Sequence, residues 1–263
     1  MPELRHIDQR NLAVFPSLRG CRVFVTGGGT GIGAAIVEAF AAQGAHTAFV
    51  DIADAESRAL VDRIASVGCP APWFRKCDVR DVSDLQAAIR EAAAALGEFQ
   101  VLVNNVASDD RHVLEAVDEA YWNDRMAINQ RPSFFAIQAV VPSMKRLGGG
   151  SIINLGSLSW HTKNPGFPCY TVAKSSVNGL TRGLAASLGK DRIRINTVSP
   201  GWVMTSRQLS MWLDADGETN LRNAQCLPDL LQSEDIARMV LFLAADDSQM
   251  CTAQEFIIDG GLS

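Results

Sequence analysis

The stretch Cys21–Phe40 reads CRVFVTGGGTGIGAAIVEAF, and its order of strand, glycine-rich turn and helix decides the fold. The apolar run Cys21–Thr26 predicts a strand, and Gly31–Gln43 has the length and apolar spacing of a helix. Between them lies Thr26–Gly33, in the context that dinucleotide-binding turns require. Glycines let the backbone approach a pyrophosphate, and the helix N-terminus offers free N–H groups and a partial positive charge. We expect cofactor contacts from Gly27, Gly29, Thr30, Gly31, Ile32 and Gly33.

Asp51, which ends the next apolar run, bears on the choice between NAD and NADP. It lies eighteen residues after Gly33. A carboxylate here accepts hydrogen bonds from the adenosine ribose hydroxyls and repels a 2′-phosphate. No Lys or Arg lies in the glycine-rich string or directly after Asp51, so the sequence favours NAD. The alternative is that Asp51 only caps the following helix. Ile52, Asp78 and Val79 are further cofactor candidates, with the Asp78 carboxylate accepting from adenine.

The rest of the chain alternates apolar runs with amphipathic segments. The expected strands are Cys21–Thr26, His46–Asp51, Trp73–Asp78, Val101–Val106, Ser151–Leu155, Ile193–Val198 and Glu255–Ile258. The expected helices are Gly31–Gln43, Ala53–Val67, Ser83–Leu96, Asp118–Leu147, Pro168–Gly189 and Ser233–Ala245. Strands separated by helices of this length form βαβ units. The pattern predicts an α/β fold with a Rossmann-type, doubly wound parallel sheet and helices on both faces.

The chain has no linker or repeat, so we expect one domain over residues 1–263. Met1–Pro16 is expected to form a short arm ahead of the first strand or to dock on a neighbouring subunit. Gly201–Leu231 is the least regular part and is expected to be a lid over the site. Ser83 and Ser233 are expected to cap the helices that follow them.

Composition narrows the classes of partner. The chain has 24 Lys and Arg against 29 Asp and Glu, which argues against a nucleic acid or an anionic membrane surface as partner. No apolar run approaches the roughly 20 residues of a membrane helix, and the N-terminus has no apolar signal region. The six cysteines show no CxxC pair and no metal spacing, so we expect reduced thiols in the cytoplasm and no metal site.

Tyr170 and Lys174 form the central catalytic pattern. They are four residues apart on an expected helix and therefore share a face. A nearby ammonium favours the phenolate and lowers the pKa of a tyrosine toward the range useful for acid–base catalysis. Ser157, just beyond the fifth strand, could hydrogen-bond the reacting oxygen. Asn129 could support a water that relays protons to Lys174.

Together these residues resemble the short-chain dehydrogenase/reductase family over essentially the whole chain. The matching segments are Thr26–Gly33, Asn104-Asn105, Asn129, Ser157, Tyr170/Lys174 and Ser199-Pro200-Gly201. The resemblance implies a seven-stranded parallel sheet, NAD or NADP, an Asn–Ser–Tyr–Lys catalytic set and, for many members, a homotetramer. It also implies that Asn105 lies near the adenosine half and Pro200, Gly201, Val203 and Thr205 near the nicotinamide. Val106-Ala107 replace the family's Ala-Gly, from which we expect a small backbone shift beside the cofactor and no loss of binding.

The segments around the expected site suggest a small neutral ligand with many hydroxyl groups. Polar side chains would bind the hydroxyls, and indoles would cover the C–H faces. The candidate substrate residues are Asp109, His112, Ser157, Trp160, His161, Tyr170, Trp202 and Gln208. With Ala224–Leu227 and Leu241–Asp247, these segments resemble the bacterial aldose 1-dehydrogenases of the family, including those acting on D-xylose. The resemblance implies oxidation of a cyclic aldose at the anomeric hydroxyl to a lactone, with Tyr170 as the general base. Ser108 replaces the family's Asn, and Thr162–Pro168 diverge.

Three alternatives stay open. One is another short-chain reductase, such as a 3-oxoacyl thioester reductase using NADPH or a polyol or ketose reductase, although Asp51 disfavours NADPH. Another is a non-catalytic NAD-binding sensor, which the intact Asn129, Ser157, Tyr170 and Lys174 disfavour. The third concerns His112 and His161 alone. They could be ordinary loop residues, since nothing in the sequence fixes the direction in which their side chains point.

Overall fold

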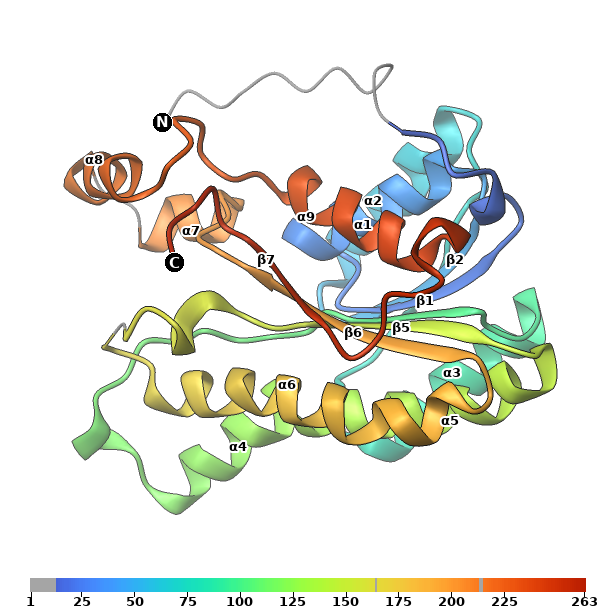
Figure 1. The fold of residues 1–263 in the computed structure, drawn as a ribbon, viewed down its shortest axis with the longest axis horizontal. Helices are drawn as coiled ribbons and strands as arrows, with labels where there is room; N and C mark the ends of the chain where they lie inside the picture. Colours follow the sequence, from blue (N-terminus) through green and yellow to red (C-terminus); the bar gives the residue numbers. More distant parts are fainter. Residues whose placement is uncertain (1–12, 164, 213–214) are drawn as a thin grey trace.

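The middle layer of the molecule is a parallel sheet with the strand order β3-β2-β1-β4-β5-β6-β7 (Figure 1). The computed structural model describes residues 13–163, 165–212 and 215–263, so residues 1–12 of the expected arm lie outside the described residues. The strands are β1 Arg22–Thr26, β2 His46–Asp51, β3 Trp73–Lys76, β4 Val101–Asn104, β5 Gly150–Leu155, β6 Ile193–Pro200 and β7 Glu255–Ile258. The predicted fold class and all seven predicted strands are confirmed, with ends that differ by up to two residues.

Helices cover both faces of the sheet (Figure 1). One face carries α1 Gly31–Ala42, α2 Asp54–Ser66 and α9 Ser233–Ala244. The other face carries α3 Val82–Leu96, α5 Arg131–Leu147 and α6 Pro168–Gly189. The helix α4, Glu119–Asn129, packs on α5 and α6. The two cores divide β1 by alternation, because Val23 and Val25 pack on one face and Phe24 on the other. No helix of the described residues is both long enough and apolar enough to cross a bilayer.

The single helix expected over Asp118–Leu147 is in fact two. α4 ends at Asn129, Gln130 has φ −130° and ψ −54°, and α5 starts at Arg131 with Pro132 in its first turn. Proline has no N–H to continue the ladder of α4, but it fits the first turn of a new helix. The break places Asn129 at the carboxyl end of α4.

The two predicted caps are wrong by one or two positions. Asp81 caps α3 by accepting a first-turn N–H at 3.0 Å, and Ser83 lies inside the helix with its hydroxyl donating to Asp81. Gln232, one residue before Ser233, is the cap position of α9, and its N–H donates to Asp235 at 2.9 Å. In α3 the Asp81 carboxylate takes the role expected of Ser83, whereas in α9 the Asp235 carboxylate accepts from the N–H of the cap residue.

The segment Gly201–Leu231 is more regular than expected. It contains α7, Ser206–Met211, and α8, Ala215–Ala224. Both helices lie at one end of the molecule, beyond β6 (Figure 1).

Candidate active site

The carboxyl ends of β1, β4 and β5 lie side by side, and the loops that leave them carry most of the expected site residues. Thr26 pairs in register with Asn104, which pairs with Asn154. The strand order reverses between β1 and β4. In open α/β sheets ligands bind at this switch point, outside the carboxyl ends of the strands.

The loop after β1 has a shape that only glycine allows at several positions. Gly27 and Gly31 have φ of 69° and 53°, in the left-handed region. A Cβ on Gly33 would collide with the carbonyl oxygen of Gly27, and a Cβ on Gly28 would lie 2.6 Å from the Cβ of Phe49. The side chain of Thr30, at the cap position of α1, makes no hydrogen bond to the first N–H groups of the helix. An uncapped helix N-terminus behind a glycine loop fits a pyrophosphate.

Asn105, directly after β4, holds this loop in place. Its Nδ2 donates to the carbonyls of Gly27 at 2.8 Å and Thr26 at 3.2 Å, and its backbone N–H donates to the Thr26 hydroxyl at 3.0 Å. The Cγ2 of Val106 would lie 2.8 Å from a Cβ on Gly27. The larger side chain at 106 therefore fits because position 27 has none. Ala107 is exposed.

Asp51 contacts both the glycine loop and the residue before α2. Its Oδ2 accepts from the N–H of Gly29 at 2.8 Å, and its Oδ1 accepts from the N–H of Ala53, the residue before α2, at 2.9 Å. Asp51 is therefore not the cap residue of α2, which is Ala53, and its carboxylate contacts both the loop and the N–H of that cap residue. One carboxylate fixes the spacing between the loop and the start of α2, in the place where a ribose is expected.

The other residues expected near the adenosine differ in their environment. Asp78 binds the Arg80 guanidinium, with its Oδ2 2.6 Å from Nη2. Hydrogen bonds from Arg80 lower the pKa of Asp78 below its usual value. The Asp78 carboxylate therefore has a protein partner where an adenine amino group was expected. Val79 is buried, and Ile52 is largely exposed beside Asp51.

The segment after β6 approaches the glycine loop. The Cγ2 of Thr205 would lie 3.3 Å from a Cβ on Gly31. Pro200 ends β6, Gly201 donates its N–H to the Ile258 carbonyl at 2.9 Å, and Val203 is buried. The first part of the expected lid is therefore fixed to β7 and lies against the loop.

Tyr170 and Lys174 lie one turn apart near the start of α6, and Ser157 follows β5. The Lys174 Nζ is 5.9 Å from the centre of the Tyr170 ring and donates to the Leu155 carbonyl at 2.7 Å. The Ser157 hydroxyl accepts from the N–H of Ser159 at 3.1 Å. The structure thus brings the phenol, the ammonium and the serine hydroxyl together at the carboxyl end of β5.

Burial controls the acid–base properties of both groups. It raises the pKa of Tyr170 to about 12, against smaller lowering effects of the Ser157 hydrogen bond and Arg111. It lowers the pKa of Lys174 to about 8. The expectation that Lys174 lowers the pKa of Tyr170 is wrong for this structure. Loss of solvent destabilises the phenolate more than the neighbouring groups stabilise it, so the pKa of the phenol is raised.

Asn129 is buried and holds the loop after β4. Its Oδ1 accepts from the N–H of Ser108 at 2.7 Å, and its Nδ2 donates to the carbonyls of Ser108 and Arg125, both at 3.1 Å. Both Nδ2 hydrogens therefore have backbone partners. Its Oδ1 also has a backbone partner, so the expected water could be accepted only at the second lone pair of that oxygen.

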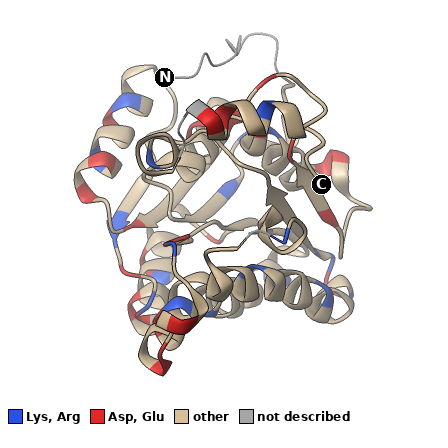
Figure 2. Ribbon diagram, turned by 90° about the vertical axis from the view of Figure 1, so that its left-hand side faces the viewer, with Lys and Arg blue, Asp and Glu red and all other residues tan. Residues whose placement is uncertain are grey.

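A chain of side-chain hydrogen bonds joins the loop after β4 to α7. Trp202 donates to Gln208 at 2.8 Å, and Gln208 donates to Asp109 at 2.7 Å. Arg207 pairs with Asp110 at 2.6 Å and lies 3.4 Å from Asp109. We call these five residues the rim. Figure 2, which views this side of the molecule, shows acidic and basic residues interspersed. Paired charges of both signs suit a neutral ligand.

The two histidines have partners within the protein. The Nε2 of His112 accepts from the N–H of Cys169 at 3.1 Å, and its Nδ1 lies 2.8 Å from a carbonyl of its own loop. The Nε2 of His161 is 3.2 Å from Glu255. This geometry argues against the expectation that either imidazole binds substrate hydroxyls. Trp160 packs on His161, with ring centres 3.7 Å apart, and remains partly exposed.

Three residues next to the site are absent from the expected set. The Arg111 guanidinium lies 4.2 Å from the centre of the Phe167 ring, and that ring meets Tyr170 edge-on at 5.5 Å. Arg125 forms an ion pair at 2.7 Å with the loop after β4. Helical spacing could have identified Arg125, four residues before Asn129. Arg111 and Phe167 come from separate loops, so no local pattern joins them.

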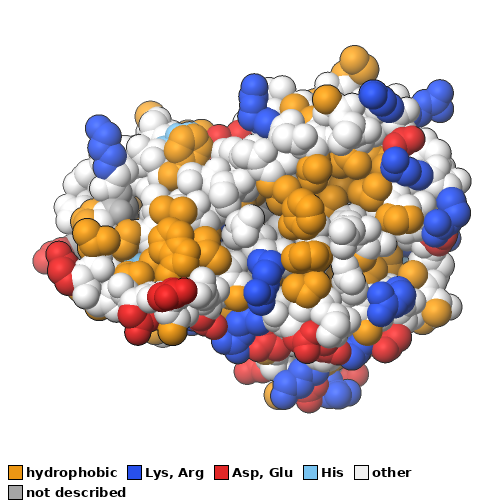
Figure 3. Space-filling model, turned by 90° about the horizontal axis from the view of Figure 1, so that it is seen from below, with side chains coloured by type: hydrophobic (Ala, Val, Ile, Leu, Met, Phe, Trp, Pro, Cys, Tyr) orange, Lys and Arg blue, Asp and Glu red, His pale blue; other side chains and the backbone are white. Residues whose placement is uncertain are grey.

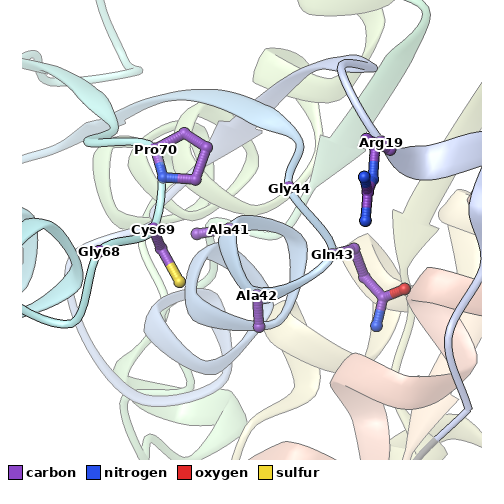
Figure 4. A pocket seen from close by; sticks show the side chains of 8 residues that line it. All are labelled: Arg19, Ala41, Ala42, Gln43, Gly44, Gly68, Cys69 and Pro70. Carbon is purple, nitrogen blue, oxygen red and sulfur yellow. The ribbon is translucent and has the colours of Figure 1, made fainter.

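A hollow of about 350 Å³ lies away from this edge, between the end of α1 and the loop after α2 (Figure 4). Arg19 and Gln43 line one side, and Cys69 and Pro70 line the other. The Gln43 amide is already used by backbone groups of residues 13 and 15. Among the described residues, no three His, Cys, Asp or Glu side chains are placed to hold a metal ion.

Comparison with known proteins places the chain in a family. The model described as enoyl-(acyl carrier protein) reductase matches residues 27–263. The chain belongs to this family, which is part of the short-chain dehydrogenases/reductases, and it is an oxidoreductase, as the sequence predicts.

Individual relatives cover nearly the whole chain. A probable galactose dehydrogenase of Rhizobium meliloti (strain 1021) is 48% identical over 94% of this chain and 97% of its own. A D-xylose 1-dehydrogenase of Caulobacter vibrioides (strain NA1000 / CB15N) is 46% identical over 95% and 98%. The solved structure of a 7α-hydroxysteroid dehydrogenase, complexed with NADH and 7-oxo glycochenodeoxycholic acid, has a TM-score of 0.89 and 29% identity over 94% of this chain and 96% of that chain.

Proposed function

We propose that the chain is an NAD-dependent sugar dehydrogenase that oxidises a cyclic aldose at its anomeric hydroxyl to a lactone. The observation that carries the proposal is the placement of Tyr170, Lys174 and Ser157 at the sheet edge that also holds the glycine loop. Similarity to the galactose and D-xylose dehydrogenases supports a sugar as the substrate.

The cofactor would lie along the glycine loop, with its ribose at Asp51. When bound, NAD supplies the acceptor for a hydride from the anomeric carbon. The Asp51 carboxylate, fixed by the N–H groups of Gly29 and Ala53, would put a negative charge where the 2′-phosphate of NADP would lie. Charge repulsion therefore favours NAD.

Tyr170 would take the proton of the anomeric hydroxyl while Ser157 hydrogen-bonds the same oxygen. Because burial holds the pKa of Tyr170 at about 12, the phenolate is scarce at neutral pH, and the oxidation rate should rise with pH. Below its pKa of about 8, the Lys174 ammonium lies against the Leu155 carbonyl beside the phenol, where its charge would oppose, without outweighing, the effect of burial on the phenolate. The proton ends on Tyr170, and a C=O bond replaces the C–OH.

The rim would select the sugar. The Asp109 carboxylate and the Gln208 amide have more donor and acceptor sites than their contacts with each other and Trp202 use, and these sites would bind hydroxyl groups. The indoles of Trp202 and Trp160 would offer flat apolar faces. His112 and His161 are left out of this proposal because their ring nitrogens have protein partners.

We also propose a single domain, with residues 201–231 as the lid, that assembles as a cytoplasmic homotetramer. The six cysteines are unpaired, which suits a reducing compartment. Apolar side chains gather on the face that α4, α5 and α6 cover, and Trp122, Phe134 and Val172 are exposed there (Figure 3). Burial of such a face between copies would remove it from water.

The test is a panel of aldoses, alditols, ketoses and a 3-oxoacyl thioester, each assayed with NAD and NADP, or with the reduced forms for carbonyl substrates. We expect NADH formation with D-xylose, D-galactose or a related aldose, a lactone as the first product, and a clear preference for NAD. Turnover confined to the acyl thioester or to ketoses, or a preference for NADP, would overturn the proposal.

A further inference from the structure

The first turn of α6 carries Tyr170 but has no cap of its own. Phe167, at the cap position, has no side-chain acceptor, and Pro168, the first residue of the helix, has no N–H. The first N–H groups of a helix lack partners within it and need an acceptor from elsewhere. Cys169 and Tyr170 are the second and third residues, so the general base lies where a helix frays most easily.

The imidazole of His112 supplies the acceptor from a loop 57 residues earlier in the chain. The N–H of Cys169 donates to Nε2 at 3.1 Å. A backbone N–H can only donate, so Nε2 is unprotonated and the proton of the neutral ring is on Nδ1. Nδ1 lies 2.8 Å from the Asp110 carbonyl and 3.0 Å from the Tyr121 hydroxyl. Both nitrogens of His112 are therefore used within the protein.

The loop that carries His112 is itself fixed. Asn129 binds both backbone groups of Ser108, Arg125 pairs with Asp110 at 2.7 Å, and the His112 N–H donates to the Gly166 carbonyl at 2.7 Å. The imidazole therefore fixes the start of α6 relative to α4 and to the edge of the sheet.

Arg111, the preceding residue, contacts the same turn from a second direction. Its guanidinium lies over the Phe167 ring, which packs edge-on against the Tyr170 ring. Adjacent residues of one loop thus hold the turn twice, once through the backbone N–H of Cys169 and once through the ring next to the phenol.

We propose that His112 is a positioning residue for the general base: by capping the first turn of α6 it fixes where the Tyr170 hydroxyl meets the substrate. The inference deepens the proposed function and rests on it. A base must lie within hydrogen-bond reach of the proton that it removes, and small misplacements reduce the rate of the chemical step. A positioning role predicts a loss in kcat, whereas direct binding of the sugar predicts a rise in KM.

The experiment compares His112→Leu and His112→Asn, which lack an acceptor at the Nε2 position, with His112→Gln, whose amide oxygen can reach the Cys169 N–H. His46→Leu, at an exposed histidine of β2, is the matched control. The measurements are kcat and KM for the best sugar of the panel, Kd for NAD, Tm, and hydrogen–deuterium exchange of the peptide that spans residues 167–172.

We expect His112→Leu and His112→Asn to lower kcat about tenfold, with KM and the Kd for NAD within twofold of wild type and faster exchange at Cys169. His112→Gln should restore most of kcat and slow exchange, and His46→Leu should match wild type. Unchanged kcat and exchange, a change confined to KM, or a Gln variant no better than Leu would overturn the inference. Exchange is measured without substrate and therefore tests the role of His112 even if the wild-type protein oxidises no sugar. Failure of the wild-type protein to oxidise any sugar would overturn the proposed function instead.

Discussion

The cofactor half of the site and the rim are held together by different kinds of contact. In the cofactor half, Asp51 and Asn105 bind backbone groups of the glycine loop. In the rim, Trp202, Gln208 and Asp109 bind one another through their side chains. Backbone contacts in a tight loop permit few substitutions, whereas side-chain pairs can be exchanged one at a time. The first half is therefore suited to one constant ligand, and the second to a substrate that varies among relatives.

Tyr170→Phe should separate chemistry from binding and has the largest expected effect. Removing the hydroxyl removes the proposed general base but leaves the ring packed on Phe167. We expect kcat to fall by about a thousandfold, with the Kd for NAD and the KM for sugar within a few fold of wild type. Steady-state kinetics and fluorescence titration with NADH check this. Retention of more than a few per cent of kcat would show that another group is the base.

Gly33→Ala should weaken cofactor binding and leave the rim unchanged. The added Cβ would collide with the Gly27 carbonyl, and moving that backbone costs about 3 kcal/mol, or about a hundredfold in the Kd for NAD. The control is Gly189→Ala at the end of α6, where a Cβ meets nothing within 4 Å and binding should not change. Calorimetric titration of both variants measures the difference; equal Kd values would refute the steric account.

The lowered pKa of Lys174, a proposed catalytic residue, makes the stability of the fold depend on pH. Its pKa is lowered from 10.5 to about 8, so between these values the unfolded chain holds a proton that the folded protein has released. Its contribution to the free energy of unfolding therefore rises with pH, by about 2 kcal/mol from pH 7 to 9.5. Cys21 and Cys77, with pKa values raised to about 11 and about 12, act in the opposite direction above pH 9.

The measurement that isolates Lys174 is urea unfolding of wild type and Lys174→Met at both pH values. The variant retains both cysteines, so their contributions cancel in the difference. We expect the difference between the two unfolding free energies to shift by about 2 kcal/mol in favour of wild type at pH 9.5. Parallel pH dependences would contradict the buried, pKa-lowered lysine.

Asp51→Ala should weaken the preference for NAD over NADP. Loss of the carboxylate removes the repulsion of a 2′-phosphate and the acceptor for the Gly29 N–H. We expect the ratio of kcat/KM for NAD to that for NADP to fall about tenfold. Asp54→Ala, in the exposed first turn of α2, is the matched control and should leave the ratio unchanged. An unaltered ratio in Asp51→Ala would place discrimination elsewhere.

Asp109→Ala should affect the rim and has the smallest expected effect. It removes the acceptor of the Gln208 amide and the proposed contact to a sugar hydroxyl. We expect KM for the sugar to rise about threefold to tenfold, with the Kd for NAD unchanged. A double-mutant cycle with Gln208→Ala should show coupling between the two residues. Additive effects, or a loss of NAD binding, would contradict the division between rim and cofactor half.

The cofactor half could be predicted from the sequence because its constraints are local. The glycines of Gly27–Gly33 are required by left-handed φ values and close backbone approach, and Asp51 follows at the end of the next strand. The Tyr170 and Lys174 pair could be predicted for the same reason, since helical spacing alone places both on one face.

Asp109, Trp202 and Gln208 were expected near the substrate, but the contacts within the rim and the directions of the histidine side chains could not be predicted, because the partners are distant in sequence. Asp109 meets Gln208 across 99 residues, His112 meets Cys169 across 57, and His161 meets Glu255 across 94. The direction of a loop side chain depends on these partners. The pKa of Tyr170 could not be predicted either, because it depends on how completely the fold removes water from the phenol.

The central claim is that groups at this sheet edge transfer hydrogen from the anomeric carbon of a sugar to NAD. The most direct test is incubation of the enzyme and NAD with the aldose deuterated at C1, followed by mass spectrometry of the reduced cofactor. Each NADH formed should carry one deuterium, the sugar product should be the lactone, and Tyr170→Phe should form neither product at a comparable rate. Unlabelled NADH, or labelled NADH formed equally fast by Tyr170→Phe, would contradict this claim.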